Sequence, residues 1–350
     1  MLFFLLACTK TPDFQERQPS IPILPAPKSS WYSTEGERPK DPLVAQVAGK
    51  MNWSEALSGA ATNIGLNIKE RQPRLDDVKW AAINAGFPYA VEKMIVGEVE
   101  LDTYPQDLER LLRDLKPRHL GLVRVRIGVM DRWIALFGEA GALEEGFQKE
   151  ARLGEQINLK GLGTMRLSDP SGEIIESSLP YTFQPQERGE WWVELKNGSV
   201  YSSVPIYVEA RTPVVNLFST NEDLGLVNKA PLDVEEEALV LMDIMRERKG
   251  LILLESDKML DSLAQYPLTY FLEGTWSAKT GLEHLQKAGF IGGPVYQLAC
   301  KAENALACLD QLSWAMDSRI ALLDPQIRMI GIKAHVETSS VSLILNLSSL

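Results

Sequence analysis

The stretch that decides the fold is Met329–Leu347, with the sequence MIGIKAHVETSSVSLILNL, close to the end of this 350-residue chain. Its two apolar halves, Met329–Val336 and Val341–Leu347, are joined by the polar run Glu337–Ser340. Apolar runs separated by a short polar segment are typical of a β-hairpin. We therefore predict that the chain closes on an antiparallel hairpin.

Four segments with helical spacing precede this hairpin. Glu235–Arg248 spaces its apolar residues for one buried helix face and ends before Gly250. The other three are Met259–Ala264, which Pro267 should end or bend, Leu282–Lys287 and Leu306–Met316. Helices followed by a hairpin predict an α+β domain over residues 233–350, with helices covering an antiparallel sheet.

Five short motifs in this region follow one another in a recognisable order. The motifs are Asp243, Arg246, Gly250 and Leu251; Leu254, Asp257, Leu260 and Ala264; Ala288–Phe290; Trp314 with Ser318–Asp324; and Ile330–Ile332. Together they resemble the CAP superfamily (cysteine-rich secretory proteins, antigen 5, pathogenesis-related 1), which implies an α-β-α sandwich.

The resemblance also implies a cleft lined by two His and two acidic residues that can bind a divalent cation. This chain departs from that pattern. Ser318 stands where a His would precede Arg319, and Gln297 stands near the expected Glu. A cleft without His has no group that titrates near neutrality, so we expect no catalytic residue, no metal and no cofactor there. The alternative is a CAP-type hydrolase or metal-dependent enzyme acting through the same cleft.

The chain has three Cys residues. Cys300 and Cys308 are eight positions apart and link an expected strand to the following helix, so in an oxidising compartment we predict a disulfide between them. The alternative is a pair of buried thiols.

The third Cys, Cys8, ends an apolar start, Met1–Ala7. Leu5-Leu6-Ala7-Cys8 matches a bacterial lipobox, although Met1–Ala7 is short for a signal peptide. Residues 1–8 are therefore interpreted as a partial signal peptide with lipidation at Cys8. Residues 9–45 read as a tether, because Thr9–Pro42 holds 7 of the 20 prolines. The predicted location is the bacterial cell envelope, as an outer-membrane lipoprotein or at the extracellular surface, with the lipid anchor as the membrane contact.

Residues 46–140 follow the same order of elements as the C-terminal region. Helical spacing in Leu57–Ile68 and around Asp76 precedes a second Ala-Gly-Phe, Ala85–Phe87, and a hairpin over Leu120–Phe137. Two interpretations remain open: a divergent second CAP-like domain, or an unrelated α+β domain with this order of elements.

Residues 151–212 between these regions are predicted to be all β, and residues 213–232 to be a linker. Turn signals at Asp169–Gly172 and Asn197-Gly198 separate short strands, which suggests a small Ig-like sandwich. Trp191 and Trp192 are adjacent, so we expect one ring in the core and one outside.

The remaining sequence features bear on function by exclusion. The net charge is −11 and Lys and Arg are dispersed, which disfavours nucleic-acid binding. His119 and His335 are expected to be structural, His284 to lie on a helix surface, and the acidic run Asp233–Glu237 to favour a helix N-terminus. The sequence thus favours a non-catalytic envelope protein that binds a lipid, glycan or protein.

Overall fold

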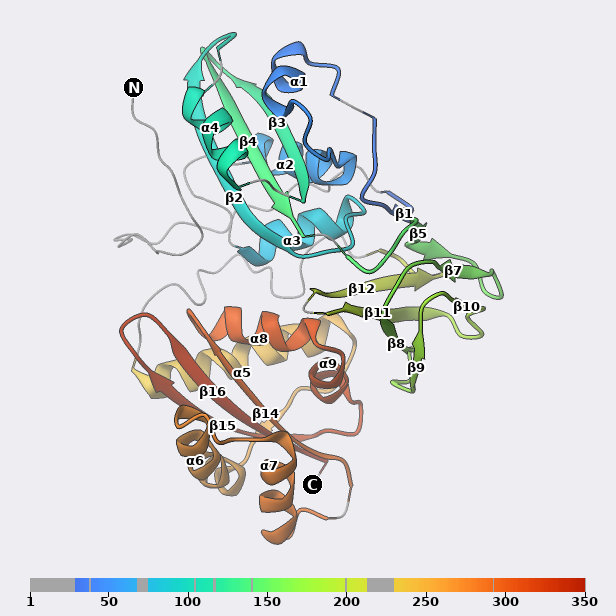
Figure 1. Ribbon diagram of the computed structural model, residues 1–350. Coiled ribbons are helices and arrows are strands. Elements are labelled where there is room, and N and C mark those ends of the chain that lie inside the picture. Colours follow the sequence, from blue (N-terminus) through green and yellow to red (C-terminus); the bar gives the residue numbers. More distant parts are fainter. Residues whose placement is uncertain are drawn as a thin grey trace. The chain divides into compact units, whose positions relative to one another are not determined.

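The structure is a computed structural model (Figure 1). It describes residues 29–349 apart from positions 38, 68–74, 104, 116–117, 140, 199, 213–229 and 292. The chain divides into two compact units, residues 1–216 and 217–350. Helices and antiparallel sheets occur in both, so the fold is α+β. Cys8, the greater part of the predicted tether and most of the predicted linker lie outside the described residues.

The C-terminal unit is built on one four-stranded sheet with the strand order β13-β15-β16-β14. Strand β13 runs parallel to β15, and the other neighbours are antiparallel. The elements, in chain order, are α5 (Pro231–Arg248), β13 (Glu255–Ser256), α6 (Lys258–Leu272), α7 (Ala278–Lys287), β14 (Val295–Ala302), α8 (Ala305–Trp314), α9 (Met316–Leu323), β15 (Met329–Val336) and β16 (Val341–Ser348).

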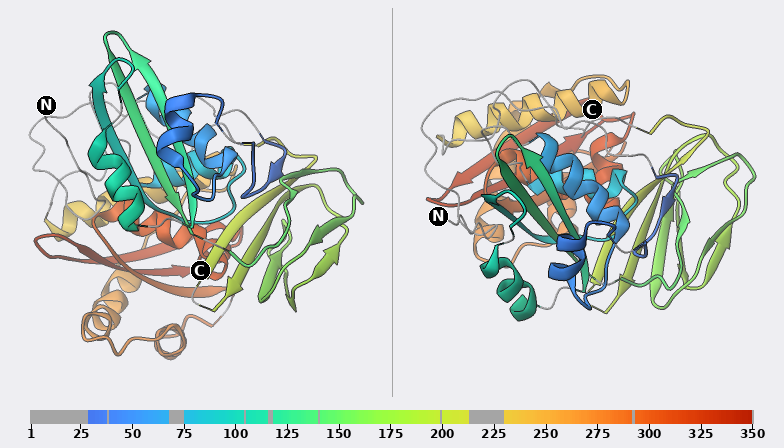
Figure 2. Two further views of the ribbon diagram at one scale, coloured as in Figure 1. Left: turned by 45° about the horizontal axis from the view of Figure 1, so that its top comes forward. Right: turned by 90° about the horizontal axis from the view of Figure 1, so that it is seen from above.

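Helices cover both faces of this sheet, with α5 and α8 on one side and α6 and α7 on the other (Figures 1 and 2). Strand β16 is buried along its whole length. Because side chains alternate along a strand, Leu343 and Leu345 point to the α5–α8 core, and Ile344 packs with Leu268 of α6. The unit is therefore an α-β-α sandwich.

The structure excludes one of the two alternatives for Pro267, that it ends its helix, and it contradicts the helix predicted over Leu306–Met316. Pro267 lies inside α6, which continues to Leu272 because Leu268 and Phe271 pack on the sheet beyond it. The helix predicted over Leu306–Met316 breaks at Ala315, whose backbone is extended. Arg319 N–H donates to the Ala315 carbonyl at 2.8 Å, and so a new helix, α9, begins there.

The N-terminal unit contains an α+β domain with a three-stranded antiparallel sheet of order β2-β4-β3. Trp53 forms a single parallel β-bridge with Leu120, and so lies beside β3 where a fourth strand of the sheet would be. The elements are α1 (Pro42–Ala48), α2 (Glu55–Asn67), α3 (Leu75–Asn84), β2 (Val91–Glu100), α4 (Gln106–Leu115), β3 (His119–Ile127) and β4 (Met130–Gly138).

This domain has the topology of the C-terminal unit, except that α9 has no counterpart among its described residues. The Trp53 bridge corresponds to β13, and β3, β4 and β2 correspond to β15, β16 and β14. Helices α1 and α4 share one core, as α5 and α8 do, while α2 and α3 pack on the opposite face. Ser54–Phe87 and Asp257–Phe290 also have equal lengths, each from the residue that caps a helix to the end of Ala-Gly-Phe.

Two glycines mark the same close approach in both domains. Gly121 on β3 and Gly331 on β15 lie against the first turn of α2 and α6. A Cβ on Gly121 would overlap Leu57, and a Cβ on Gly331 would overlap the backbone of Leu260. Only glycine lets the helix lie this close to the strand.

The rest of the N-terminal unit is β. A five-stranded sheet, β6-β12-β11-β8-β9, accompanies the two-stranded sheets β10-β7 and β1-β5. The strands are β1 (Trp31–Tyr32), β5 (Phe147–Gln148), β6 (Glu150–Ala151), β7 (Ile157–Leu159), β8 (Thr164–Ser168), β9 (Ile174–Ser178), β10 (Tyr181–Phe183), β11 (Gly189–Asn197) and β12 (Val200–Val208).

Two expectations about this part are wrong. Trp191 and Trp192 are both buried, at 7% and 6% exposure, because β11 lies between β12 and β8 and is covered on both faces. The predicted tether ends earlier than residue 45. Tyr32 is fully buried, and its hydroxyl donates to the Pro205 carbonyl at 2.7 Å.

Candidate functional site

Gln297 lies at the centre of a hydrogen-bond network of two side-chain amides and one indole on the α6–α7 face of the C-terminal sheet. Trp276 Nε1 donates to Gln297 Oε1 at 2.9 Å, and Gln297 Nε2 donates to Asn346 Oδ1 at 2.8 Å. Asn346 Nδ2 then donates to the Leu260 carbonyl at 2.9 Å. The register causes this arrangement, because Gln297 on β14 is directly opposite Asn346 on β16. We call these three side chains the amide network.

The amide network is buried and closely packed. Gln297 is 4% exposed and Asn346 is 0% exposed. Gly281 of α7 lies so close that a Cβ would overlap the Gln297 amide. Each buried amide is hydrogen-bonded, as burial of a polar group requires. None of the three side chains titrates near neutrality, so the network by itself offers no acid or base.

Ser318 and Arg319 do not join this network. They lie on α9, whose Ala321 and Leu322 pack in the core shared by α5 and α8. Gln297 points to the opposite face of the sheet, towards α6 and α7. The Arg319 guanidinium is buried and donates to the Ser313 carbonyl at 3.1 Å, which fastens α9 to the end of α8. The structure thus separates the cleft positions that the sequence suggested.

Arg246, which carries the first CAP-like motif, is a buried structural residue. It is 0% exposed and donates to the carbonyls of Ile252 at 2.8 Å, Leu322 at 2.9 Å and Ile327 at 3.1 Å. These carbonyls belong to the loop after α5, to α9 and to the segment before β15. The arginine therefore joins the loop after α5 to the end of α9 and the segment that follows it, more than 70 residues later in the chain.

The acidic run at the start of α5 also has a structural partner. Glu235 accepts a hydrogen bond from the Ala334 N–H at 3.1 Å and pairs with Lys333 at 3.2 Å. From α6, Asp261 accepts from the Ile332 N–H at 2.9 Å. Both carboxylates occupy edge N–H groups of β15 beyond β13, where an open strand would otherwise be free to pair with another chain.

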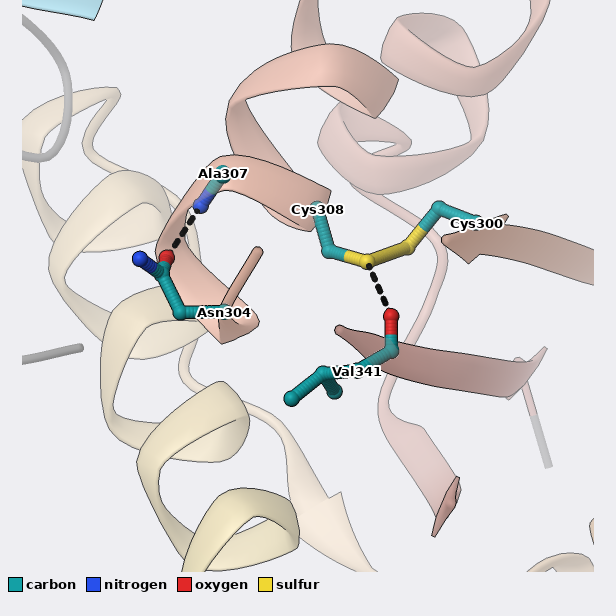
Figure 3. The surroundings of a disulfide bond; sticks show 5 residues. All are labelled: Cys300, Asn304, Ala307, Cys308 and Val341. Atoms are coloured by element: carbon teal, nitrogen blue, oxygen red, sulfur yellow. Dashed lines mark hydrogen bonds between the residues drawn. A yellow bond between two sulfur atoms is a disulfide. The ribbon is translucent and has the colours of Figure 1, made fainter. Parts of the chain in front are cut away.

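Cys300 and Cys308 lie at disulfide distance, as their spacing predicts (Figure 3). Their Cα atoms are 5.6 Å apart, and the bond joins the end of β14 to the first turn of α8. Asn304 caps that turn by accepting from the Ala307 N–H at 2.8 Å. Both sulfur-bearing residues are buried, so the disulfide forms part of the α5–α8 core.

An exposed group of rings on α6 and α7 was missed by the sequence reasoning. Tyr266 and His284 stack with ring centroids 5.5 Å apart and an interplanar angle of 27°. Tyr270 meets Tyr266 edge-on at 4.7 Å, and the two hydroxyls hydrogen-bond. We call Tyr266, Tyr270 and His284 the aromatic surface. The i, i+4 spacing of the two tyrosines was the available signal. His284 lies on the helix surface, as expected.

Glu139 and His119, whose pKa values are both shifted, lie at the same end of the sheet of the N-terminal α+β domain. Burial, the charge of Glu92 and a hydrogen bond with Glu92 raise the pKa of Glu139. Burial lowers the pKa of His119, whose ring packs edge-on against Phe87 at 5.8 Å. His335, in contrast, is exposed near Glu337. Within the described parts of the chain, no three His, Cys, Asp or Glu side chains are placed to hold a metal ion.

No helix in the described ranges is long and apolar enough to cross a membrane. No protein-family model matches the sequence, and no curated protein gives a significant match.

Three solved structures are similar to the chain at a TM-score of 0.30. An outer surface protein of Borrelia burgdorferi is 12% identical, over 35% of this chain and 96% of its own. A cysteine-rich secretory protein of Staphylococcus aureus is 13% identical, over 55% and 83%. An extracellular protein with an SCP domain from Bacillus anthracis is 12% identical, over 74% and 79%. Likenesses of this strength are too weak to carry an inference about function.

Proposed function

We propose that this chain is a non-catalytic binding or structural protein of the bacterial cell envelope. The observation that supports this best is the amide network. Where the CAP resemblance implies a Glu, Gln297 has its amide oxygen bonded to Trp276 and its amide nitrogen bonded to Asn346. A carboxylate available for acid or base chemistry is replaced by a neutral group that braces the loop before α7.

The competing function is a hydrolase, and Ser318 is the residue on which it would depend. Ser318 needs a neighbouring base to become a nucleophile, and the His of the family pattern is the residue that it replaces. We expect purified protein to hydrolyse no substrate in peptide, ester and glycan panels and to retain no stoichiometric zinc by elemental analysis. Metal-dependent turnover that disappears in Ser318→Ala would establish the enzyme instead.

The domain assignment is part of this proposal. We infer two CAP-like domains, residues 46–140 and 233–350, and an Ig-like domain over residues 151–212. The shared strand order, the paired glycines and the repeated Ala-Gly-Phe support the first inference. The five-stranded sheet with its small partner sheet supports the second.

Anchoring through Cys8 is tested separately from catalysis. Protein expressed with a complete signal peptide fused ahead of Leu5–Cys8 should incorporate labelled palmitate and partition into detergent, and Cys8→Ser should lose both properties. Cys300→Ser with Cys308→Ser is the matched control, because it removes the other two cysteines without touching the lipobox. Unchanged partitioning of Cys8→Ser would exclude the anchor.

A further inference from the structure

We propose that the aromatic surface, Tyr266, Tyr270 and His284, binds a neutral glycan strand of β-linked N-acetylhexosamines. This goes beyond the proposed function by naming a ligand class and a surface for it. It depends on the proposed envelope location only for the choice of polymer, the glycan strand of the cell wall.

The rings are placed to receive a ligand rather than to support a core. Tyr266 is 56% exposed and Tyr270 is 37% exposed, while His284 is half-buried and stacks on Tyr266 from the neighbouring helix. Three rings from α6 and α7 thus form one patch at the solvent boundary. An aromatic face is apolar and packs against C–H groups, which the faces of a sugar ring present.

The edges of the same rings are polar. The two tyrosine hydroxyls bond to each other, which uses one donor and leaves one hydroxyl proton and several lone pairs for a ligand. A protein partner that excluded water from these hydroxyls would pay a desolvation cost unless it offered each of them a hydrogen bond. A sugar satisfies both demands, because its C–H faces alternate with hydroxyls.

The stretch of α6 that carries the two tyrosines has no charged residue, and the nearest charges are Glu273 just after it and Glu283 and Lys287 on α7. Residues 262–272 of α6 contain no Asp, Glu, Lys or Arg, although Ser262, Gln265 and Thr269 are exposed. The solvent face of a surface helix usually carries charged residues. Hydroxyl and amide groups in their place match a neutral, hydroxyl-rich ligand better than an anionic or cationic one.

Apolar side chains extend the aromatic surface along α6 towards the start of that helix. Met259 is 50% exposed and Leu263 is half-buried, and both lie at helical spacing from Tyr266. Such side chains beside an aromatic platform suit the methyl group of an N-acetyl substituent. This distinguishes an N-acetylated glycan from an unsubstituted one.

The N-terminal α+β domain shows that the fold does not require these rings. In the matched interval, Asn63 stands at the position of Tyr266 and Ala81 at the position of His284. Both are buried, at 6% and 2% exposure. The same topology therefore forms without an aromatic surface, and the tyrosines are a separate addition.

The test uses the full-length protein and soluble chitotetraose, measured by calorimetry and NMR line broadening. We expect chitotetraose to bind, cellotetraose to bind more weakly, and Tyr266→Ala to weaken binding by about tenfold, the size of one good aromatic contact. Tyr266→Phe should keep most of the stacking and lose the hydroxyl contribution.

Trp31→Ala is the matched control, because Trp31 is an exposed aromatic residue, 49% exposed, in the other unit. It should leave binding unchanged, and circular dichroism should show each variant folded. Absence of chitotetraose binding up to its solubility limit, or equal affinity of Tyr266→Ala and the parent protein, would overturn the proposal. Either result leaves lipidation at Cys8 and catalytic silence untouched, so the two proposals fail separately.

Discussion

The two α+β domains share a topology and differ in how they fill the space between sheet and helices. At one register position the N-terminal domain pairs Met94 with Leu136, both buried and apolar, whereas the C-terminal domain pairs Gln297 with Asn346. The neighbouring helix compensates: Val78 faces the first pair and Gly281 the second. The fold thus accepts either a buried apolar pair or a buried pair of amides at this position. The topology therefore does not require the amide network.

The two domains also differ in the buried interactions that hold their loops and elements together. In the C-terminal domain, buried Arg246 joins the loop after α5 to the end of α9 and the segment before β15, and a disulfide joins one strand to one helix. The described residues of the N-terminal α+β domain have no disulfide. Instead, Asp131, 1% exposed, accepts from the Asp102 N–H at 2.8 Å and pairs with Arg124 at 3.0 Å. The C-terminal domain should therefore be the more sensitive to loss of one buried group.

Removing the Arg246 guanidinium is the change with the largest expected effect. Arg246→Met should destabilise the C-terminal unit by about 3–5 kcal/mol, because several buried carbonyls lose their donor at about 1–3 kcal/mol each. Hydrogen exchange read by mass spectrometry would follow β15 separately from the N-terminal unit. Arg248→Met, at an exposed position on the same helix, is the control and should change little. Equal protection in both variants would contradict the structural role.

The disulfide should contribute the next largest effect. Reduction, or Cys300→Ser with Cys308→Ser, should lower the stability of the C-terminal unit by about 2–3 kcal/mol on the chain-entropy estimate. The N-terminal unit should be unaffected in the same denaturation experiment. Peptide mapping without reduction should yield one cross-linked pair, and two freely alkylated thiols in protein from an oxidising compartment would show that the bond is absent.

The paired glycines test whether the two domains are equivalent. Gly121→Ala and Gly331→Ala should each cost about 1–3 kcal/mol, because each new methyl group meets the backbone of the helix that it faces. Gly97→Ala is the control, since the nearest atom to its Cβ would be 3.8 Å away. Stability is measured by urea unfolding. A large loss of stability at one of the two glycines and none at the other would show that the two domains are not equivalent at this contact.

The pair Gln297–Asn346 can be replaced by the apolar pair that the N-terminal α+β domain has at this position, Met94–Leu136. Gln297→Met alone should cost about 1–3 kcal/mol, because it leaves Trp276 and Asn346 without their partner. Adding Asn346→Leu should recover part of that loss, as a double-mutant cycle on thermal unfolding would show. Strictly additive losses would mean that the two side chains do not act together.

The sequence predicts the α+β class, the closing hairpin and the repeated order of elements from periodicity and turn residues, and the disulfide from the spacing of Cys300 and Cys308. It fails where tertiary packing decides. Pro267 continues a helix because of the sheet beneath it, and Trp192 is buried because β11 is central. The cleft residues show the same limit. Gln297 and Ser318 can be matched to a motif, but the face of the sheet to which each belongs depends on strand register and on the break at Ala315.

The smallest predicted effect concerns the sheet end where the two domains differ in charge. Glu139 follows β4 and lies near Glu92, whereas Ser349 follows β16 at the corresponding place. Burial and Glu92 raise the pKa of Glu139 in the folded state. The folded protein then binds the proton more tightly than the unfolded chain, so this group supports folding at low pH and loses that contribution as pH rises through its folded pKa.

Glu139→Gln should therefore leave stability unchanged below about pH 4 and raise it slightly at neutral pH, by less than about 0.5 kcal/mol, because the site is largely screened by solvent. The measurement is urea unfolding of the N-terminal unit at a series of pH values. Glu144→Gln, at an exposed carboxylate of the same unit, should leave the pH dependence as it is. A variant that is less stable than the parent at neutral pH would mean that the charge of Glu139 is favourable, through Arg118, rather than opposed by Glu92.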